Sequence, residues 1–481
     1  MNKRLVIKVL GAILLVEALA MLPSCLIGLI YRDPNDASSL LFSMIILAVL
    51  GLPLWLLAKP QENNMRAKEG FVIVALAWLL LSAFGALPFV LSGMIPNYID
   101  ALFESVSGFT TTGATVMVRF EHLPHGVMFW RAFTHWIGGM GVLVFMLALL
   151  PQMTGRTSHL VRAESPGPSM SKIVPKMGDS AKILYLIYAA LTVIEFVALM
   201  IAGMSVYDAA IHALSTAGTG GFSTYGASIG AFNSLAIEII ITVFMLLYGV
   251  NFALYYHALI GDWKAFYKSE ELRWYLGIYL FSVIVITIFI SPMYGSLGQG
   301  IRYSTFEVAS IVSTTGFGVV DFNTWPQGAK AVVLVLMFFG SCAGSTAGGM
   351  KTIRVALLCK LGLREVRRTF QPRKVQVVRF EGKGVEETQL SQISIFFFVY
   401  IALILVGMFL ISLENKFDVQ ANFSAALTCV SNVGPGFGAI ASDFAGYGPF
   451  AKLVLSILML AGRLEMFPIL VLFHPAIWRK G

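Results

Sequence analysis

The stretch Asp100-Ala-Leu-Phe-Glu-Ser-Val-Ser-Gly-Phe-Thr-Thr-Thr-Gly113 decides the fold of this chain, because its pattern occurs four times in the sequence. A second copy ends at Gly221 and a third ends at Gly316, and both align with the first without a gap. The fourth copy, which ends at Gly434, is the most divergent and aligns only near its glycine. Copies that recur at a spacing of roughly 100 residues indicate one structural unit repeated along the chain.

The composition indicates an integral membrane protein. Of the 481 residues, 57% are hydrophobic and only 12% are charged, with a mean hydropathy of +0.79. A soluble protein of this length needs more charge on its surface. Apolar runs of about 20 residues recur from end to end, a length that crosses a bilayer as a helix, whereas barrel strands would show alternating segments of about 10 residues. We therefore expect an all-α polytopic membrane protein with crossings or near-crossings at about 5–31, 38–58, 71–92, 128–150, 182–203, 234–259, 274–292, 330–359, 391–413 and 450–478.

Lys and Arg residues are distributed unequally between the two sides of these spans. One side has 24 of the 34, and the connections on the other side have 7, which are Arg32, Arg119, Arg131, Arg302, Lys330, Lys416 and Lys452. By the positive-inside rule the richer side, which includes both ends of the chain, faces the cytoplasm. The net charge of +8 therefore reflects membrane topology and not nucleic-acid binding. The basic segment 360–390 is still a candidate for docking an acidic partner or lipid headgroups.

The repeated stretches have the features of pore loops. The segments before the glycines, at about 99–109, 207–217, 304–312 and 420–430, are too short to span a bilayer and suit re-entrant half-helices. A half-helix that enters from outside directs its partly negative C-terminal end at the pore axis, which favours a cation there. The Gly- and Thr-rich backbone that follows can replace the water around an ion with carbonyl oxygens. One such loop could be ordinary packing of small residues, but four in register favour a cation pore without an acidic ring.

Four short motifs carry a resemblance to a known family: Thr-Thr-Thr112-Gly113-Ala114, Thr219-Gly220-Gly221-Phe222, Thr314-Thr315-Gly316-Phe317 and Asn432-Val433-Gly434-Pro-Gly. They resemble the filters of TrkH-type potassium transporters of the Trk/Ktr/HKT superfamily, and the resemblance covers nearly the whole chain. It implies a potassium-binding filter at Thr111, Thr112, Gly113, Thr219, Gly220, Gly221, Thr314, Thr315, Gly316, Asn432, Val433 and Gly434. A glycine in all four copies resembles the potassium-selective members. The second and fourth copies depart from the pattern, because Gly220 and Val433 stand where the other copies have Thr, so the four sites should not be chemically equivalent.

The resemblance also implies an architecture and partners. It implies four M1–P–M2 repeats, like those of potassium channels, around one pseudo-fourfold pore, preceded by two extra N-terminal helices. The corresponding ranges are 1–70 for the N-terminal helices and 71–150, 182–259, 274–360 and 391–481 for the repeats, of which the third alone is expected to have a broken inner helix. The implied activity is uptake of K⁺ and Rb⁺ across the bacterial inner membrane by a multi-pass homodimer. The implied regulator is a cytoplasmic nucleotide-binding ring protein of the TrkA type.

The expected eighth span is interrupted by Gly340-Ser-Cys-Ala-Gly344-Ser345-Thr346-Ala347-Gly348-Gly349-Met350-Lys351. So many glycines and small polar residues should break a helix in mid-membrane. The resemblance implies a loop below the filter that gates the pore, made by Gly340, Gly344, Ser345, Thr346, Gly348, Gly349 and Lys351. Two other interpretations stay open. One is a close-packed helix crossing, and the other is a phosphate-binding loop, which Gly344-x4-Gly349-Met-Lys351-Thr352 resembles despite its extra Met and the helix before it.

Arg463 lies well inside the last expected span, where a buried charge is costly and points to a function. The resemblance implies that this arginine lies beneath the filter as an electrostatic barrier. The alternative is a buried ion pair with a carboxylate such as Glu465 or Glu195. Glu465 is the weaker of these partners, because it is only two residues away and on a different face of the helix.

The remaining chemistry-bearing residues give no sign of an enzyme. Cys25, Cys342, Cys359 and Cys429 lie in or beside apolar segments without metal spacing, which favours reduced and buried thiols. The histidines, including His135 and His212, form no zinc motif and suit structural roles. We find no nucleophile–base arrangement and expect no cofactor, so an intramembrane enzyme is only the alternative from another class. Within transport, the alternative is a sodium-conducting or cation-coupled symporter.

Overall fold

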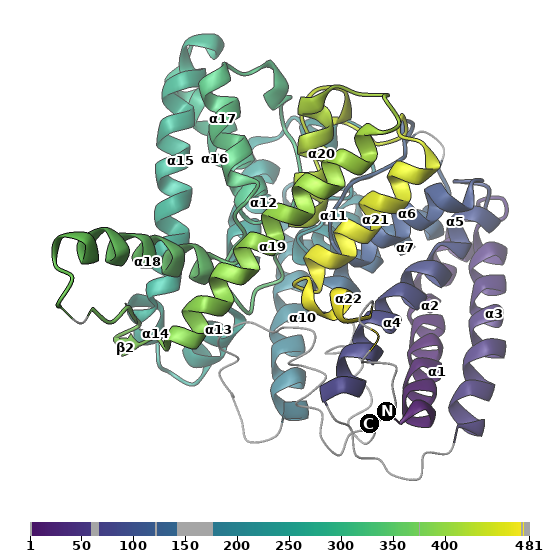
Figure 1. The fold of residues 1–481 in the computed structure, drawn as a ribbon. Coiled ribbons are helices and arrows are strands. Elements are labelled where there is room, and N and C mark those ends of the chain that lie inside the picture. Colours follow the sequence, from purple (N-terminus) through teal and green to yellow (C-terminus); the bar gives the residue numbers. More distant parts are fainter. Residues whose placement is uncertain are drawn as a thin grey trace.

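The computed structural model describes residues 2–58, 67–120, 123–141, 177–374, 376–472 and 475, and most of these are helical (Figure 1). Among them, six helical segments are long and apolar enough to cross a membrane, and one sharply bent helix pair is a seventh candidate. The only strands in the described part of the chain are β1 (Arg379–Phe380) and β2 (Lys383–Gly384), which form a small antiparallel hairpin. The expected all-α polytopic membrane protein is confirmed.

Three helices at the N-terminus form a group at one side of the molecule (Figure 1). They are α1 (Lys3–Ala20), α2 (Leu22–Tyr31) and α3 (Asp36–Leu57), and α1 packs along α3. Two glycines permit this close approach. A Cβ on Gly11 would lie 2.7 Å from the backbone nitrogen of Trp55, and one on Gly51 would lie 2.9 Å from the carbonyl oxygen of Gly11. Small residues at the crossing therefore let the two backbones meet, as in other membrane helix pairs.

The rest of the bundle repeats one order of elements four times: a long helix, a short helix, a loop and a further helix. The long helices are α4 (Ala67–Gly85), α10 (Met177–Ile201), α15 (Glu270–Tyr294) and α19 (Glu387–Ser412). The short helices are α6 (Tyr98–Phe109), α11 (Val206–Ala217), α16 (Leu297–Val312) and α20 (Val419–Ser431). The further helices are α7 (His125–Gly139), α12 (Leu235–Tyr248), α17 (Gln327–Leu336) and α21 (Pro449–Arg463). Shorter connecting elements are α5 (Leu87–Leu91), η2 (Ser228–Phe232), η3 (Phe322–Thr324) and η4 (Gly438–Ile440).

The positions of the four short helices agree with the predicted half-helices, with one difference in length. α16 begins at Leu297, well before the expected start near residue 304. Within this additional part of α16, Arg302 makes two hydrogen bonds of 2.6 Å to the carboxylate of Glu238 on α12. That carboxylate is buried, so the ion pair fixes the first turns of α16 against α12.

The inner helix is broken in more than one repeat, so the expectation that only the third repeat has this feature is wrong. α12 and α13 (Phe252–Leu259), which lie within the crossing or near-crossing expected over 234–259, meet at 92°. The side chain of Asn251 caps α13 by accepting the N–H of Ala253 at 2.9 Å. In the fourth repeat, α21 ends at Arg463, and Glu465 and Met466 have left-handed φ angles of 52° and 68° before α22 (Phe467–Leu472).

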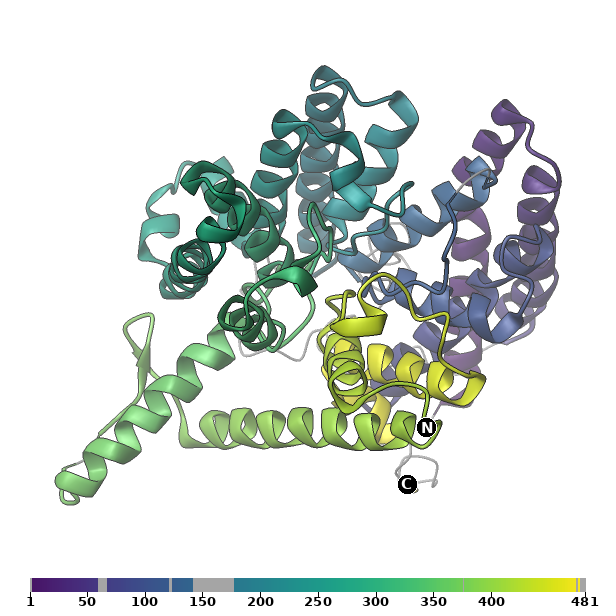
Figure 2. The same cartoon turned by 90° about the horizontal axis from the view of Figure 1, so that it is seen from above.

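Within the described part of the chain, the longest break is in the third repeat. α17 ends at Leu336, and α18 (Thr352–Phe370) begins only after the Gly-rich segment. α18 then extends away from the bundle, and after the hairpin of β1 and β2 the long helix α19 leads back to it (Figure 2). A short helix, α14 (Lys264–Lys268), precedes α15.

Candidate functional site

The four Gly-containing loops share one backbone conformation. In each, the first residue has a left-handed φ of 53–56°, at Thr111, Thr219, Thr314 and Asn432. Two residues later a glycine again has a positive φ, at Gly113, Gly221, Gly316 and Gly434. The N–H of the residue between them bonds back to the preceding helix, from Thr112 to Ser107, Gly220 to Ser215, Thr315 to Ser310 and Val433 to Thr428, at 2.9–3.0 Å. Each half-helix therefore ends in the same left-handed cap, which turns the chain into the loop.

The loops meet in a closed ring. A Cβ built on Gly113 would overlap the carbonyl oxygen of Gly220 in the second loop, and one on Gly221 would overlap that of Thr315 in the third. A Cβ on Gly316 would overlap the carbonyl oxygen of Val433 in the fourth loop. The ring closes where a Cβ on Gly434 would lie 2.6 Å from the carbonyl oxygen of Thr112. All four distances are below 3.0 Å, so only glycine fits at these positions, for reasons of both φ and space.

The side chains of the ring are fully buried at Thr111, Thr112, Thr219, Thr314, Thr315, Asn432 and Val433, and several of them are hydrogen-bonded. The hydroxyl groups of Thr315 and Ser313 lie 2.6 Å apart, and those of Thr112 and Thr110 lie 2.7 Å apart. The amide nitrogen of Asn432 donates to the hydroxyl oxygen of Thr112 at 2.9 Å, which joins the fourth loop directly to the first. The feature that recurs in all four copies is a backbone carbonyl oxygen that lies against the glycine of another loop.

The Gly-rich segment between α17 and α18 lies against the ring. The N–H of Gly348 donates to the hydroxyl oxygen of Thr314 at 2.7 Å, and a Cβ on Gly348 would lie 2.7 Å from that of Asn432. The two ends of the segment are joined, because the N–H of Gly340 donates to the carbonyl of Met350 at 2.9 Å. The segment is thus a closed loop that touches the third and fourth ring loops from the side of the inner helices.

Other contacts place the remaining predicted loop residues. The carbonyl of Gly344 accepts the N–H of Phe252 at 3.0 Å, so the loop fits into the break between α12 and α13. Ser345 donates to the carbonyl of Cys342 at 2.6 Å, and Lys351 donates to that of Ala347. Gly349 has a φ of 66° and packs against Gly340.

Arg463 joins this loop to the first repeat. One guanidinium nitrogen donates to the carbonyl oxygen of Thr346 at 2.9 Å. The other donates to those of Gly138 and Gly139, at 2.5 and 2.6 Å, where α7 ends. The carboxylate of Glu465, the partner considered in the alternative interpretation, instead forms an ion pair with Arg354 on α18. The arginine is therefore bound to carbonyl groups at the ends of the inner elements.

Comparison with known proteins identifies the family. A family model described as TrkH, cation transport protein, matches residues 37–480. The chain belongs to the TrkH family. The Trk system potassium uptake protein TrkH of Salmonella typhimurium is 38% identical, and TrkG of Escherichia coli is 34% identical, over 100% and 99% of both chains. The crystal structure of the potassium transporter TrkH from Vibrio parahaemolyticus superposes with a TM-score of 0.90 at 35% identity, covering 100% of both chains. The match places the chain among transport proteins and not among enzymes.

In this TrkH-family chain, buried polar residues at equivalent positions of the first three repeats hydrogen-bond to the segments next to the ring. In the first repeat, Glu104 accepts the hydroxyl of Thr115 at 2.8 Å and the N–H of Val116 at 2.9 Å. In the second repeat, His212 takes the place of Glu104, and its Nε2 lies 2.9 Å from the hydroxyl oxygen of Ser223. In the third, Glu307 accepts the N–H of Val319 at 2.8 Å. Each contact fixes the chain just after the ring glycine.

These supports were not predicted as site residues, although the repeat alignment contains the signal. Glu104 and Glu307 occupy matching positions in segments that should lie inside a membrane, where a carboxylate needs a partner. Arg131, which the charge count placed in an outer connection, is such a partner. It is only 2% exposed within α7, its Nε lies 2.6 Å from Glu104, and its guanidinium carbon lies 3.4 Å from the ring centroid of Phe222. The sequence assignment of Arg131 was therefore wrong.

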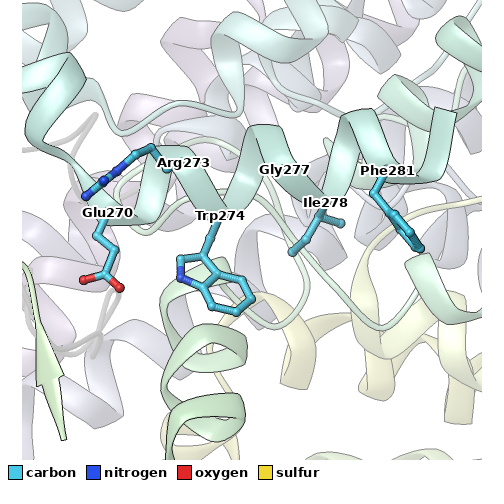
Figure 3. A pocket seen from close by; sticks show the side chains of 6 residues that line it. All are labelled: Glu270, Arg273, Trp274, Gly277, Ile278 and Phe281. Atoms are coloured by element: carbon cyan, nitrogen blue, oxygen red, sulfur yellow. The ribbon is translucent and has the colours of Figure 1, made fainter. Parts of the chain in front are cut away.

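Two further features are the cysteines and one groove. The four cysteines are free, but the expectation that all of them are buried is wrong, because Cys359 is exposed and Cys25 is partly exposed, whereas Cys342 and Cys429 are buried. A groove of about 510 Å³ runs along α15 (Figure 3), where Trp274, Ile278 and Phe281 point to the same side. Its lining residues are Glu270, Arg273, Trp274, Gly277, Ile278 and Phe281, and none of them belongs to the ring or to the loop. Among the residues that the structure describes, no group of three or more His, Cys, Asp or Glu residues could hold a metal ion.

Proposed function

We propose that this chain takes up K⁺, and Rb⁺ in its place, across the bacterial cytoplasmic membrane through the ring of four loops. The closed ring is the observation that supports the proposal, because four loops of one conformation close on one another and each ring glycine lies against a backbone carbonyl oxygen of another loop. The similar proteins TrkH and TrkG, which are named as potassium uptake proteins, support potassium as the ion.

The electrostatics of the ring favour a cation. Four helices, α6, α11, α16 and α20, end where the ring begins, and a helix C-terminus carries roughly half a negative charge. Carbonyl oxygens can replace the hydration shell of K⁺ without a carboxylate. The twelve filter residues are Thr, Gly, Asn and Val, so no acidic side chain among them would favour a divalent ion.

The loop over residues 340–351 is the proposed gate. It contacts Thr314 and Asn432 of the ring, and Arg463 donates to its Thr346 carbonyl. A cation that leaves the ring on this side meets a guanidinium group, which opposes its passage by electrostatic repulsion. In the proposed open state the loop moves aside, its hydrogen bond to Arg463 breaks, and the path past the arginine widens.

The proposal extends to orientation and assembly. The positive-inside count places both termini in the cytoplasm, which makes the half-helices enter from outside. The homodimer, the TrkA-type nucleotide-binding partner and the repeat boundaries at 71–150, 182–259, 274–360 and 391–481 follow from the family resemblance. Part of the first repeat, residues 142–150, lies outside the described residues.

Purified protein in liposomes tests the function. We expect flux of K⁺ and Rb⁺ well above that of Na⁺, with a driving force set by the cation gradient. Na⁺ flux equal to that of K⁺ would support a sodium-conducting protein instead. Uphill K⁺ accumulation that requires a proton or sodium gradient would support a coupled symporter. If none of the three ions is transported by folded protein, the proposed function is wrong.

A further inference from the structure

One buried carboxylate from a neighbouring helix holds both arms of the proposed gating loop. Glu271, in the first turn of α15, is 5% exposed. Its Oε1 atom accepts the N–H of Ala343 at 2.7 Å and that of Ile353 at 3.2 Å. Ala343 lies in the arm that leaves α17, and Ile353 lies in the first turn of α18. A single oxygen atom thus bridges the two arms.

The oxygen atom of Glu271 satisfies the N–H groups of Ala343 and Ile353 at a buried site. Ile353 belongs to the first turn of a helix, where N–H groups have no partner within the helix. The N-cap residue, Lys351, makes no side-chain capping bond, and a lysine has no acceptor with which to make one. A carboxylate at this helix start also interacts favourably with the helix dipole. Because the site is buried, water cannot easily replace Glu271.

Glu270, the residue before Glu271, binds elements that extend away from the bundle. The carboxylate of Glu270 pairs with Lys360 on α18 and accepts the N–H of Glu381, in the turn of the hairpin, at 2.9 Å. The first turn of α15 is therefore bound to the loop through Glu271, and to the middle of α18 and the hairpin through Glu270. A shift of the hairpin would be passed to the loop through these adjacent residues.

We propose that Glu271 is a positioning residue that latches the 340–351 loop in its closed position under the ring. This inference rests on the proposed gating function of the loop. When the carboxylate is lost, the N–H groups of Ala343 and Ile353 lose their common acceptor and the two arms can separate. The ring itself is not in contact with Glu271 and should keep its selectivity.

Cys342 provides a local reporter, because it directly precedes Ala343 and is only 1% exposed. The test uses a variant in which Cys342 is the only thiol, through Cys25→Ala, Cys359→Ser and Cys429→Ala. Glu271→Ala and Glu271→Gln are added separately, and the rate at which a small hydrophilic methanethiosulfonate labels Cys342 is measured. Glu17→Gln is the control for the loss of a buried carboxylate elsewhere, because Glu17 is 2% exposed and lies in α1. Rb⁺ flux and the K⁺/Na⁺ ratio are measured in liposomes with the same proteins.

We expect Glu271→Ala to raise the labelling rate and the Rb⁺ flux about tenfold, with the K⁺/Na⁺ ratio unchanged. Glu271→Gln should give a smaller increase, because its amide oxygen can still accept, and it keeps the test valid if the alanine variant does not fold. Faster labelling without a change in flux supports the latch but contradicts the gate. Labelling as slow as in the Glu17→Gln control, in folded Glu271 variants, overturns the latch whether or not the loop is a gate.

Discussion

Replacing Gly113 with serine tests the ring of loops most directly. Gly113 has a φ of 79°, and a left-handed conformation costs an L-residue roughly 1–2 kcal/mol. The new Cβ would also have to displace the carbonyl oxygen of Gly220 by about 1 Å to reach a separation of 3.0 Å. A displacement of this size changes the distance between an ion and one of its carbonyl ligands. We expect the K⁺/Na⁺ selectivity ratio to fall about tenfold, which corresponds to an unequal loss of about 1.4 kcal/mol in ion binding.

The assay is the ratio of K⁺ to Na⁺ flux in liposomes, with the thermal-unfolding midpoint measured on the same protein. Gly316→Ser should act in the same direction, since its Cβ would face the carbonyl oxygen of Val433. Gly93→Ser is the matched control. Gly93 has the same φ of 79°, but no atom lies within 4 Å of its Cβ position. This control carries the backbone strain without the contact with the ring.

The reasoning is refuted if both ring variants are folded and keep the parental selectivity ratio. Equal losses of selectivity in Gly93→Ser and Gly113→Ser would also contradict it, because the effect would then come from backbone strain alone. The structure further predicts an order. Gly434 is the least crowded ring glycine, with 2.6 Å to the carbonyl oxygen of Thr112, so Gly434→Ser should disturb the ring by steric overlap less than Gly113→Ser does.

Four further predictions concern the gate, the supports and the N-terminal helices. Arg463→Ala should raise K⁺ flux about tenfold by removing a positive charge from the path, and a stable but inactive protein would point to a structural role. Deletion of residues 344–349 should also raise flux, and a fall in flux from a folded protein would contradict the gating assignment. Arg131→Met should leave the Glu104 carboxylate buried and unpaired, at a cost of about 3–5 kcal/mol; the unfolding midpoint should recover when Glu104→Gln is added. Gly11→Leu should separate α1 from α3 and lower that midpoint, by overpacking worth about 1–3 kcal/mol, without changing selectivity.

The fold class and the position of the ring could be predicted from the sequence because they depend on local patterns. Long apolar runs predict membrane helices whatever surrounds them. The repeated glycines predict positive φ angles, and all four of Gly113, Gly221, Gly316 and Gly434 have them. Repetition adds the decisive information, since one Gly-rich turn would have had several explanations and four in register have few.

The partners of buried charges could not be predicted, because they come from helices far apart in the sequence. Arg131 reads as a loop residue next to an apolar run, and only the packing of α7 against α6 shows that it neutralises Glu104. Glu271 likewise meets Ala343, 72 residues further along the chain. The breaks in α12 and α21 were missed for a related reason. Their sequences are apolar runs with only a few polar residues, and the breaks depend on capping by Asn251 and on left-handed Glu465 and Met466.

The two irregular positions of the ring, Gly220 and Val433, have different physical explanations. In the second loop there is no room for a side chain, because a Cβ on Gly220 would overlap the ring of His135 from α7. That imidazole stacks on Phe222, with 4.0 Å between ring centroids, and so occupies the space of the missing Thr side chain. In the fourth loop the fully buried Val433 has no hydroxyl group, and the neighbouring Asn432 supplies the polar contacts, to Thr112 and to the carbonyl of Met459 at 2.9 Å each. The surroundings therefore compensate for the asymmetry of the ring. The compensating contacts join the second loop to α7 and the fourth loop to α21, the two helices whose ends meet at Arg463.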